Sequence, residues 1–400
     1  MSLKRPAVAA AAAGGSSLAS KKVRAEATKF QYVQEVKPAH RFQTVAAYHG
    51  EKGLRKQMED EHLICPSVRS SVPGQKANLP EKWDMGVYAV FDGHGGRKSA
   101  VFIRDNLVTE IVQHLTQLAD GSLAVSAPAQ ASVKVKAESG EAAASTNGNG
   151  SAPMDLETVP VSVGPSALLP PSAVKAVIRA AFLRLDSRLA IEIPSCKDGC
   201  TAVVLFLHGE TGYVANLGDS GAVLAREGPL KCPTYKEGQP VGDADEVHAI
   251  PLSEAHKPWV PAENHRVLRA GGTVENGRVN GSLEVTRSFG DLSVKRYGVL
   301  CSPSYMKFDV LPGKDLFVLL GCDGFWNPWS GLDAAMFLDE ALEEERRRSR
   351  VEDHKPQVDL RTVCKKAVEY VIDEKKSQDN VSLLLLLFLA PESETNGMTD

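Results

Sequence analysis

Short apolar runs separated by turn-forming residues fill the central and C-terminal parts of the chain. Tight turns such as His208-Gly-Glu-Thr-Gly212 separate some of these runs, which favours antiparallel hairpins. The predicted strands are Val87–Phe91, Ala202–Leu207, Tyr213–Leu217, Ala222–Ala225, Leu316–Leu320 and Val381–Leu389.

Apolar residues at intervals of three and four predict a smaller number of amphipathic helices. They are Ser99–Leu118, Ser172–Ile191, His265–Ala270, Gly331–Arg348 and Leu360–Asp373. Hairpins and helices that occur in separate runs predict an α+β fold built of layers.

Three segments have a composition that does not support a packed structure. Residues 1–40 form a basic tail, residues 391–400 form a polar tail, and residues 119–172 lack aromatic side chains and are rich in Ala, Ser, Gly, Pro and Val. Such segments bury too little apolar surface to offset the entropy of ordering the chain. Because helices are predicted on both sides of residues 119–172, this segment is interpreted as an insertion in one domain, residues 41–390.

Two basic clusters in the N-terminal tail, separated by small residues, have the pattern of a bipartite nuclear-import signal. They consist of Lys4, Arg5, Lys21, Lys22 and Arg24. The import interpretation predicts binding to an import carrier and a nuclear location, with a solvated basic tail and a cytoplasmic protein as the alternative. The Ala-rich stretch Ala7–Ala13 also resembles the start of a secretory signal, so secretion before nuclear entry stays open.

Charge and cysteine content narrow the classes of function. The formal net charge of -4 gives no nucleic-acid signature, and no apolar run reaches the ~20 residues that a membrane helix needs. The seven cysteines include no CxxC pair, which favours buried thiols over disulfides or a zinc site. The CX5R pattern of a cysteine-based phosphatase is absent. We expect a monomer that binds neither nucleic acid nor membrane.

Aspartates at the ends of predicted strands, most of them beside a glycine, carry the chemical signal. A single Asp-Gly pair is ordinary turn chemistry, but a repeated pattern at strand ends indicates rigidly mounted ligands. Carboxylate and carbonyl oxygens are the ligands that Mg²⁺ and Mn²⁺ prefer. The positions are Asp60 with Glu59, Asp92, Asp219, Asp323 and Asp379.

Eight stretches resemble the motifs of the type 2C (PPM) protein phosphatases, and they occur in the order of that family. They are Arg55…Glu59-Asp60, Phe91-Asp-Gly-His-Gly-Gly96, Gly199-Cys-Thr-Ala202, Ala215-Asn-Leu-Gly-Asp-Ser220, Ala270-Gly-Gly272, Leu283-Glu-Val-Thr-Arg-Ser-Phe-Gly-Asp291, Cys322-Asp-Gly324 and Asp379-Asn380. The resemblance spans residues 48–389 apart from the insertion. The stretch that ends at Asp291 is similar to the integrin-linked-kinase-associated subgroup.

The resemblance implies a sandwich of two antiparallel β-sheets flanked by α-helices. It also implies that phosphoserine and phosphothreonine in proteins are hydrolysed by a water that bridges two Mg²⁺ or Mn²⁺ ions. Arg55 would bind the substrate phosphate through both arms of its guanidinium. His94 would protonate the leaving oxygen, with a purely hydrogen-bonding role as the alternative. The implied metal ligands are Asp60, Asp92, the Gly93 carbonyl, Asp323 and Asp379, and Glu59 and Asn380 would hold metal-bound waters.

The chain departs from the family pattern at two single positions and around residues 231–250. Gly221 stands where the family usually has an arginine, and Asn327 stands where many members have an aspartate that helps to bind a third ion. Asp219 remains as a ligand for that ion, but an amide oxygen binds a cation less strongly than a carboxylate does, so a third ion is doubtful. A catalytically silent, phosphatase-like nuclear binding module and a hydrolase of small phosphate esters are the alternative functions.

Overall fold

The computed structural model describes residues 42–72, 79–123, 167–228, 247–352 and 358–389 of the 400-residue chain. All of them belong to one unit, Glu35–Asp400. The predictions for the N-terminal tail, for the C-terminal tail and for residues 124–166 of the insertion fall outside the described residues.

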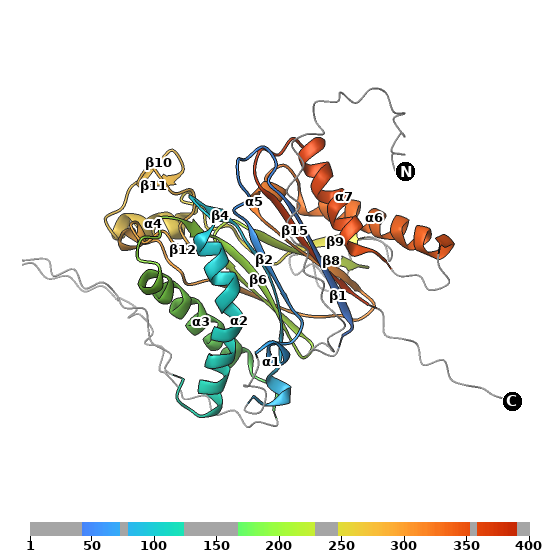
Figure 1. Ribbon diagram of the computed structural model, residues 1–400, viewed down its shortest axis with the longest axis horizontal. Helices are drawn as coiled ribbons and strands as arrows, with labels where there is room; N and C mark the ends of the chain where they lie inside the picture. Colours follow the sequence, from blue (N-terminus) through green and yellow to red (C-terminus); the bar gives the residue numbers. More distant parts are fainter. Residues whose placement is uncertain (1–41, 73–78, 124–166, 229–246, 353–357, 390–400) are drawn as a thin grey trace, which may run out of the picture. The chain divides into compact units, whose positions relative to one another are not determined.

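Two five-stranded antiparallel sheets form the centre of the described part (Figure 1). The first has the order β1-β15-β14-β8-β9, with the bounds Thr44–Glu51, Val381–Phe388, Asp315–Gly321, Gly221–Glu227 and Val247–Pro251. The second has the order β13-β7-β6-β3-β2, with the bounds Ser304–Asp309, Thr211–Leu217, Ala202–His208, Gly86–Phe91 and Glu61–Cys65. The predicted fold class, two antiparallel sheets flanked by helices, is confirmed.

Alternation of side chains along strand β3 shows how the layers are stacked. Tyr88 and Val90 point into a core shared with the first sheet, whereas Val87, Ala89 and Phe91 join a second core with the helices. Successive side chains of a strand face opposite sides of the sheet, so β3 lies in an inner layer with both faces covered. This double burial explains why the strand reads as one apolar run in the sequence.

Two pairs of helices cover the outer faces of the sandwich. Helices α2 (Lys98–Ala119) and α3 (Pro171–Glu192) pack on each other and on the core of the second sheet. Helices α6 (Gly331–Glu352) and α7 (Leu360–Asp373) cover the first sheet. Helices α2 and α3, which flank residues 124–166, are therefore neighbours. The interpretation of that segment as an insertion stays a prediction. None of the helices in the described ranges is long and apolar enough to cross a lipid bilayer.

Shorter elements complete the described structure. Helix α4 was predicted as His265–Ala270, but it begins four residues earlier, at Pro261. The elements are α1 (Val68–Ser71), α4 (Pro261–Arg269), α5 (Asp323–Trp326), β4 (Gly93–His94), β5 (Gly199–Cys200), β10 (Val274–Glu275), β11 (Arg278–Val279) and β12 (Phe289–Gly290), with 3-10 turns at Glu81–Trp83 and Lys295–Tyr297.

Candidate metal centre and phosphate site

Strand ends from both sheets bring the predicted aspartates together. Asp92 follows β3 and Asp219 follows β7 of the second sheet, while Asp323 follows β14 and Asp379 precedes β15 of the first. Asp60 directly precedes β2. The carboxylate of Asp92 interacts electrostatically with all four others, so the five residues form one cluster.

The cluster has the donor set and the spacing of a cation site. One ligand atom each from Asp92, Asp219 and Asp323 lie within 4.8 Å of one another, and the same holds for Asp60, Asp92 and the Cys322 thiol. Oδ2 of Asp60 accepts a hydrogen bond of 2.7 Å from the Ser382 hydroxyl, but the buried Oδ1 has no hydrogen-bond partner. A buried carboxylate oxygen without a partner is costly unless a cation binds it, so the residues present fit a hard divalent ion.

The raised pKa values of the clustered aspartates also indicate a cation site. Burial, and then the charges of Asp379 and Asp323, raise the pKa of Asp60 to about 7, although hydrogen bonds from Ser382 and Cys322 oppose the rise. Burial and the charges of Asp219 and Asp379 raise the pKa of Asp323 to about 6. Burial and the surrounding aspartates likewise raise the pKa of Asp92 well above its ordinary value. Carboxylates crowded in this way ionise fully only when positive charge compensates them.

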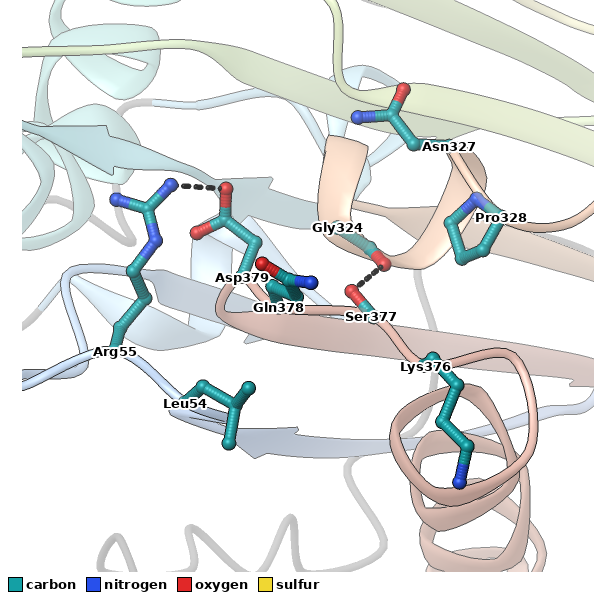
Figure 2. Close-up of a pocket in the computed structure, with 9 residues that line it drawn as sticks. All are labelled: Leu54, Arg55, Gly324, Asn327, Pro328, Lys376, Ser377, Gln378 and Asp379. Carbon is teal, nitrogen blue, oxygen red and sulfur yellow. Dashed lines mark hydrogen bonds and ion pairs between the residues drawn. The ribbon is translucent and has the colours of Figure 1, made fainter.

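Arg55 lies at the solvent-facing side of the cluster. Its guanidinium donates to Oδ2 of Asp379 at 2.6 Å, and its side chain is 58% exposed. Figure 2 shows both residues beside an open cavity of about 650 Å³, which Leu54, Gly324 and Asn327 also line. An exposed guanidinium next to a cation site is available to an incoming phosphate.

The loop that carries Arg55 and Asp60 is held in place by Asn380. The Asn380 side-chain oxygen accepts from the Glu59 amide at 2.9 Å, and its side-chain nitrogen donates to the carbonyls of Lys52 and Gln57 at 3.1 and 3.0 Å. These three bonds tie the loop to the start of β15. The predicted roles of Glu59 and Asn380 on metal-bound waters stay predictions.

His94 is paired with Asp291, a contact that the sequence analysis did not identify. Nε2 of His94 lies 2.7 Å from Oδ2 of Asp291, which also accepts a 2.6 Å hydrogen bond from the Ser288 hydroxyl. Burial alone would lower the pKa of His94, but the hydrogen bond and charge of Asp291 outweigh it and raise that pKa above its ordinary value. Asp291 lies in one of the recognised motifs, which was the available signal.

The absence of a side chain at Gly199 makes the His94–Asp291 pair possible. A β-carbon at this position would lie 2.2 Å from Oδ2 of Asp291 and 2.6 Å from Nε2 of His94. Both distances are far below van der Waals contact. The glycine of the Gly199-Cys-Thr-Ala202 motif is therefore required by the close approach of two side chains.

The two single-position departures from the family pattern have structural counterparts. Trp326 fills the space beside Gly221, since a β-carbon there would lie 3.1 Å from the indole nitrogen, which donates to the Gly221 carbonyl. The Asn327 amide donates to Oδ2 of Asp323 at 3.2 Å and so presents its nitrogen, not its oxygen, to the cluster. Asp219 forms an ion pair with Lys257, a residue that the sequence analysis did not consider.

A helix-flanked sandwich that gathers aspartates beside an arginine and a histidine has the architecture of a metal-dependent phosphatase. The chain belongs to the protein phosphatase 2C family, because the sequence pattern of that family matches residues 165–381. Metal dependence is general to this family. The enzyme class predicted from the sequence, a protein phosphatase, is thereby confirmed, as is the resemblance on which the prediction was based.

Individual proteins extend the match to the N-terminal half of the site. The chain is 30% identical to probable protein phosphatase 2C 67 of rice, over 84% of this chain and 73% of that protein. It is 28% identical to the integrin-linked kinase-associated serine/threonine phosphatase 2C of cattle, over 84% and 74%. A serine-threonine phosphatase 2C of Toxoplasma gondii shares the fold, with a TM-score of 0.56, 20% identity, and coverage of 86% of this chain and 94% of that one.

Proposed function

We propose that this chain hydrolyses phosphoserine and phosphothreonine in proteins, with two Mg²⁺ or Mn²⁺ ions held by Asp60, Asp92, the Gly93 carbonyl, Asp323 and Asp379. The observation that carries the proposal is the buried, unpartnered Oδ1 of Asp60 within a cluster of five aspartates. Family membership and the serine/threonine phosphatases among the relatives support the substrate class.

Each aspartate would hold the ions from a different position in the cluster. When two divalent ions are bound here, they supply a water activated for attack on phosphorus and neutralise charge on the transferred group. Asp92 lies close to both Asp60 and Asp323, so its carboxylate would help to hold both ions. The Ser382 hydroxyl orients Asp60 by binding Oδ2, which leaves Oδ1 facing the cluster.

Arg55 and His94 act on the substrate. The exposed guanidinium of Arg55 would exchange its contact with Asp379 for the phosphate oxygens, because a phosphate offers a second acceptor for the planar fork. His94 would donate a proton to the leaving serine or threonine oxygen. Asp291 supports this role because it favours the protonated imidazole near neutral pH, where a general acid must still hold its proton.

The decisive test is turnover of a phosphothreonine peptide by wild type and by Asp323→Asn, with Mn²⁺, with Mg²⁺ and with EDTA. We expect metal-dependent turnover that EDTA abolishes and that falls at least about 100-fold in the variant, because a lost ligand removes charge stabilisation worth several kcal/mol. Asp309→Asn is the matched control, since Asp309 is 69% exposed on β13. Thermal unfolding verifies that each variant is folded.

The same assay separates this proposal from its rivals. A folded wild type with no turnover under either metal would overturn the catalytic proposal and favour a phosphatase-like binding module. A higher kcat/KM for free phosphoserine or p-nitrophenyl phosphate than for the peptide would instead assign the chain to small phosphate esters. Retained activity in the folded Asp323→Asn protein would contradict the assignment of Asp323 as a metal ligand.

A further inference from the structure

An ammonium group contacts one member of the aspartate cluster. Nζ of Lys257 forms an ion pair with Oδ2 of Asp219, and their side chains are only 14% and 8% exposed. Asp219 in turn belongs to the ligand group with Asp92 and Asp323. Lysine is a cation at physiological pH, and this ion pair places its charge directly against the Asp219 carboxylate.

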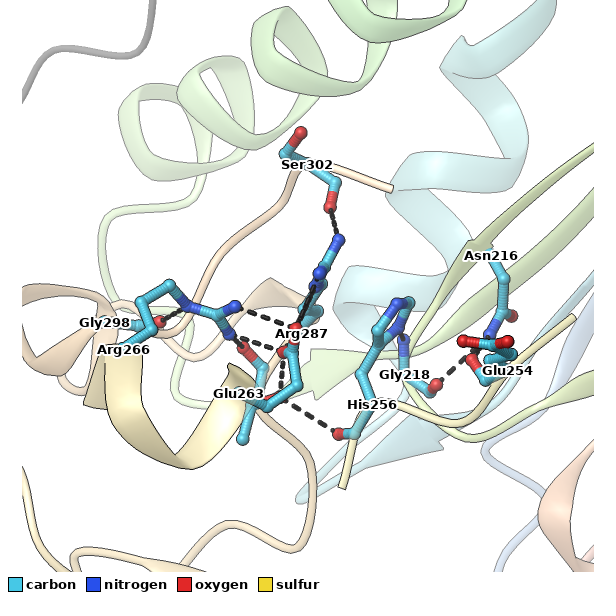
Figure 3. Close-up of polar contacts among 10 residues, drawn as sticks. Asn216, Gly218, Glu254, His256, Glu263, Arg266, Arg287, Gly298 and Ser302 are labelled. Atoms are coloured by element: carbon cyan, nitrogen blue, oxygen red, sulfur yellow. Dashed lines mark hydrogen bonds and ion pairs between the residues drawn. The ribbon is translucent and has the colours of Figure 1, made fainter. Parts of the chain in front are cut away.

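The backbone fixes the position of this lysine. The amide of Gly218 donates to Nδ1 of His256 at 3.1 Å, and the amide of His256 donates back to the Gly218 carbonyl at 2.9 Å (Figure 3). Two bonds between these residues place their successors, Asp219 and Lys257, opposite each other. Burial, followed by the charge of Arg287, lowers the pKa of His256 to about 4, so its ring stays neutral and keeps the acceptor that this arrangement needs.

A second layer of contacts anchors the segment that carries Lys257. The backbone amide of Thr286 donates to the His256 carbonyl at 2.9 Å. Thr286 is itself bonded to the buried Glu263, whose carboxylate binds the guanidinium groups of Arg266 and Arg287. Figure 3 shows this network around Glu263. These contacts hold the backbone next to Lys257 in one position. The ion pair between Lys257 and Asp219 is therefore fixed by the fold.

We infer that Lys257 is a fixed cation of the metal centre, which neutralises Asp219 and limits the centre to two divalent ions. The inference rests on the proposed two-ion function. Five ionised aspartates carry five negative charges. Two divalent ions compensate four of these charges and the Lys257 ammonium compensates the fifth, while the Arg55 guanidinium beside Asp379 is left for the substrate phosphate. Asn327 fits this balance, because its amide donates to Asp323 where a further carboxylate would attract another ion. Lys257 is thus a positioning residue that sets the stoichiometry of the centre.

Counting bound Mn²⁺ tests the inference without measuring catalysis. Free Mn²⁺ is followed by electron paramagnetic resonance as it is titrated into wild type, Lys257→Met and Lys257→Arg. Methionine keeps much of the length but not the charge, so Lys257→Met should bind one more Mn²⁺ per chain than wild type. Arginine keeps the charge, and Lys257→Arg should give the wild-type count. Equal counts for wild type and a folded Lys257→Met would overturn the inference.

Asp219→Asn provides an independent reading if Lys257→Met fails to fold. If Lys257 already neutralises Asp219, this carboxylate holds no divalent ion. Asp219→Asn should then bind as many Mn²⁺ ions per chain as wild type does. A loss of one ion in Asp219→Asn would mean that a divalent ion, and not Lys257, occupies this carboxylate. A wild-type protein that binds Mn²⁺ but hydrolyses no phosphopeptide would refute the proposed function, while the difference between wild type and the variants would still decide the role of Lys257.

Discussion

Removing the metal should make the stability of the protein fall as the pH rises. Asp60 has a pKa of about 7 in the folded chain, against an ordinary value of 3.8. Between these values the native state holds a proton that the unfolded state has released. Unfolding is then favoured as the pH increases, so the metal-free protein is stabilised below about pH 4 and loses that contribution progressively up to about pH 7.

The magnitude follows from the two pKa values. At 1.36 kcal/mol per pH unit, a rise from 3.8 to about 7 corresponds to about 4 kcal/mol. Only the part between pH 5 and about pH 7, about 3 kcal/mol, is lost in the window from pH 5 to pH 8. At roughly 2 °C per kcal/mol for a large domain, the Tm of the metal-free protein should fall by about 5 °C over this window. Saturating Mn²⁺ binds the ionised form and should remove most of this decline.

The assay is thermal unfolding followed by circular dichroism at pH 5, 6, 7 and 8, in EDTA and in Mn²⁺. Asp60→Asn retains an acceptor for the Ser382 hydroxyl but cannot ionise, so its metal-free Tm should decline less than that of wild type. Asp309→Asn, which alters an exposed carboxylate, should follow wild type. A metal-free wild type whose Tm is flat or rises over this window would refute the reasoning, as would an Asp60→Asn decline equal to that of wild type.

Three further outcomes can be measured. Asp291→Asn should lower the pKa of His94 and move the alkaline limb of the kcat/KM profile to lower pH, because the acid must be protonated; an unmoved limb would argue for a purely structural Asp291. Deletion of residues 124–166 should change the Tm by no more than a few degrees, since α2 and α3 pack directly on each other, and failure to fold would contradict an insertion. Alanine at three basic positions should redistribute a fluorescent fusion from nucleus to cytoplasm, whereas unchanged nuclear fluorescence would reject the import signal. The three positions are Lys21, Lys22 and Arg24.

The inner strands could be predicted from the sequence, but the edge strands could not. β6 and β15 are buried on both faces and therefore appear as unbroken apolar runs. β1, β9, β13 and β2 lie at the sheet edges and are only partly buried along most of their length. Their mixed polar and apolar residues give no continuous pattern, because pairing partners from distant parts of the chain determine that they are strands.

The same distinction applies to the site. Asp92 and Asp323 could be predicted because each follows an apolar strand within a recognisable motif. The partners of His94 and Asp219 could not, since Asp291 is 197 residues from the histidine and Lys257 is 38 residues from the aspartate. Such pairs are created by folding, and no local spacing in the sequence indicates them.

Mounting the aspartates on both sheets has a consequence for the lifetime of the protein. Asp92 and Asp219 extend from one sheet, and Asp323 and Asp379 extend from the other, so bound ions would fasten the two halves of the sandwich at this edge. Ions that bind only the closed arrangement lower the population of opened molecules by mass action. Proteases act on such opened molecules. The supply of divalent metal would then govern how long each molecule survives as well as how fast it works.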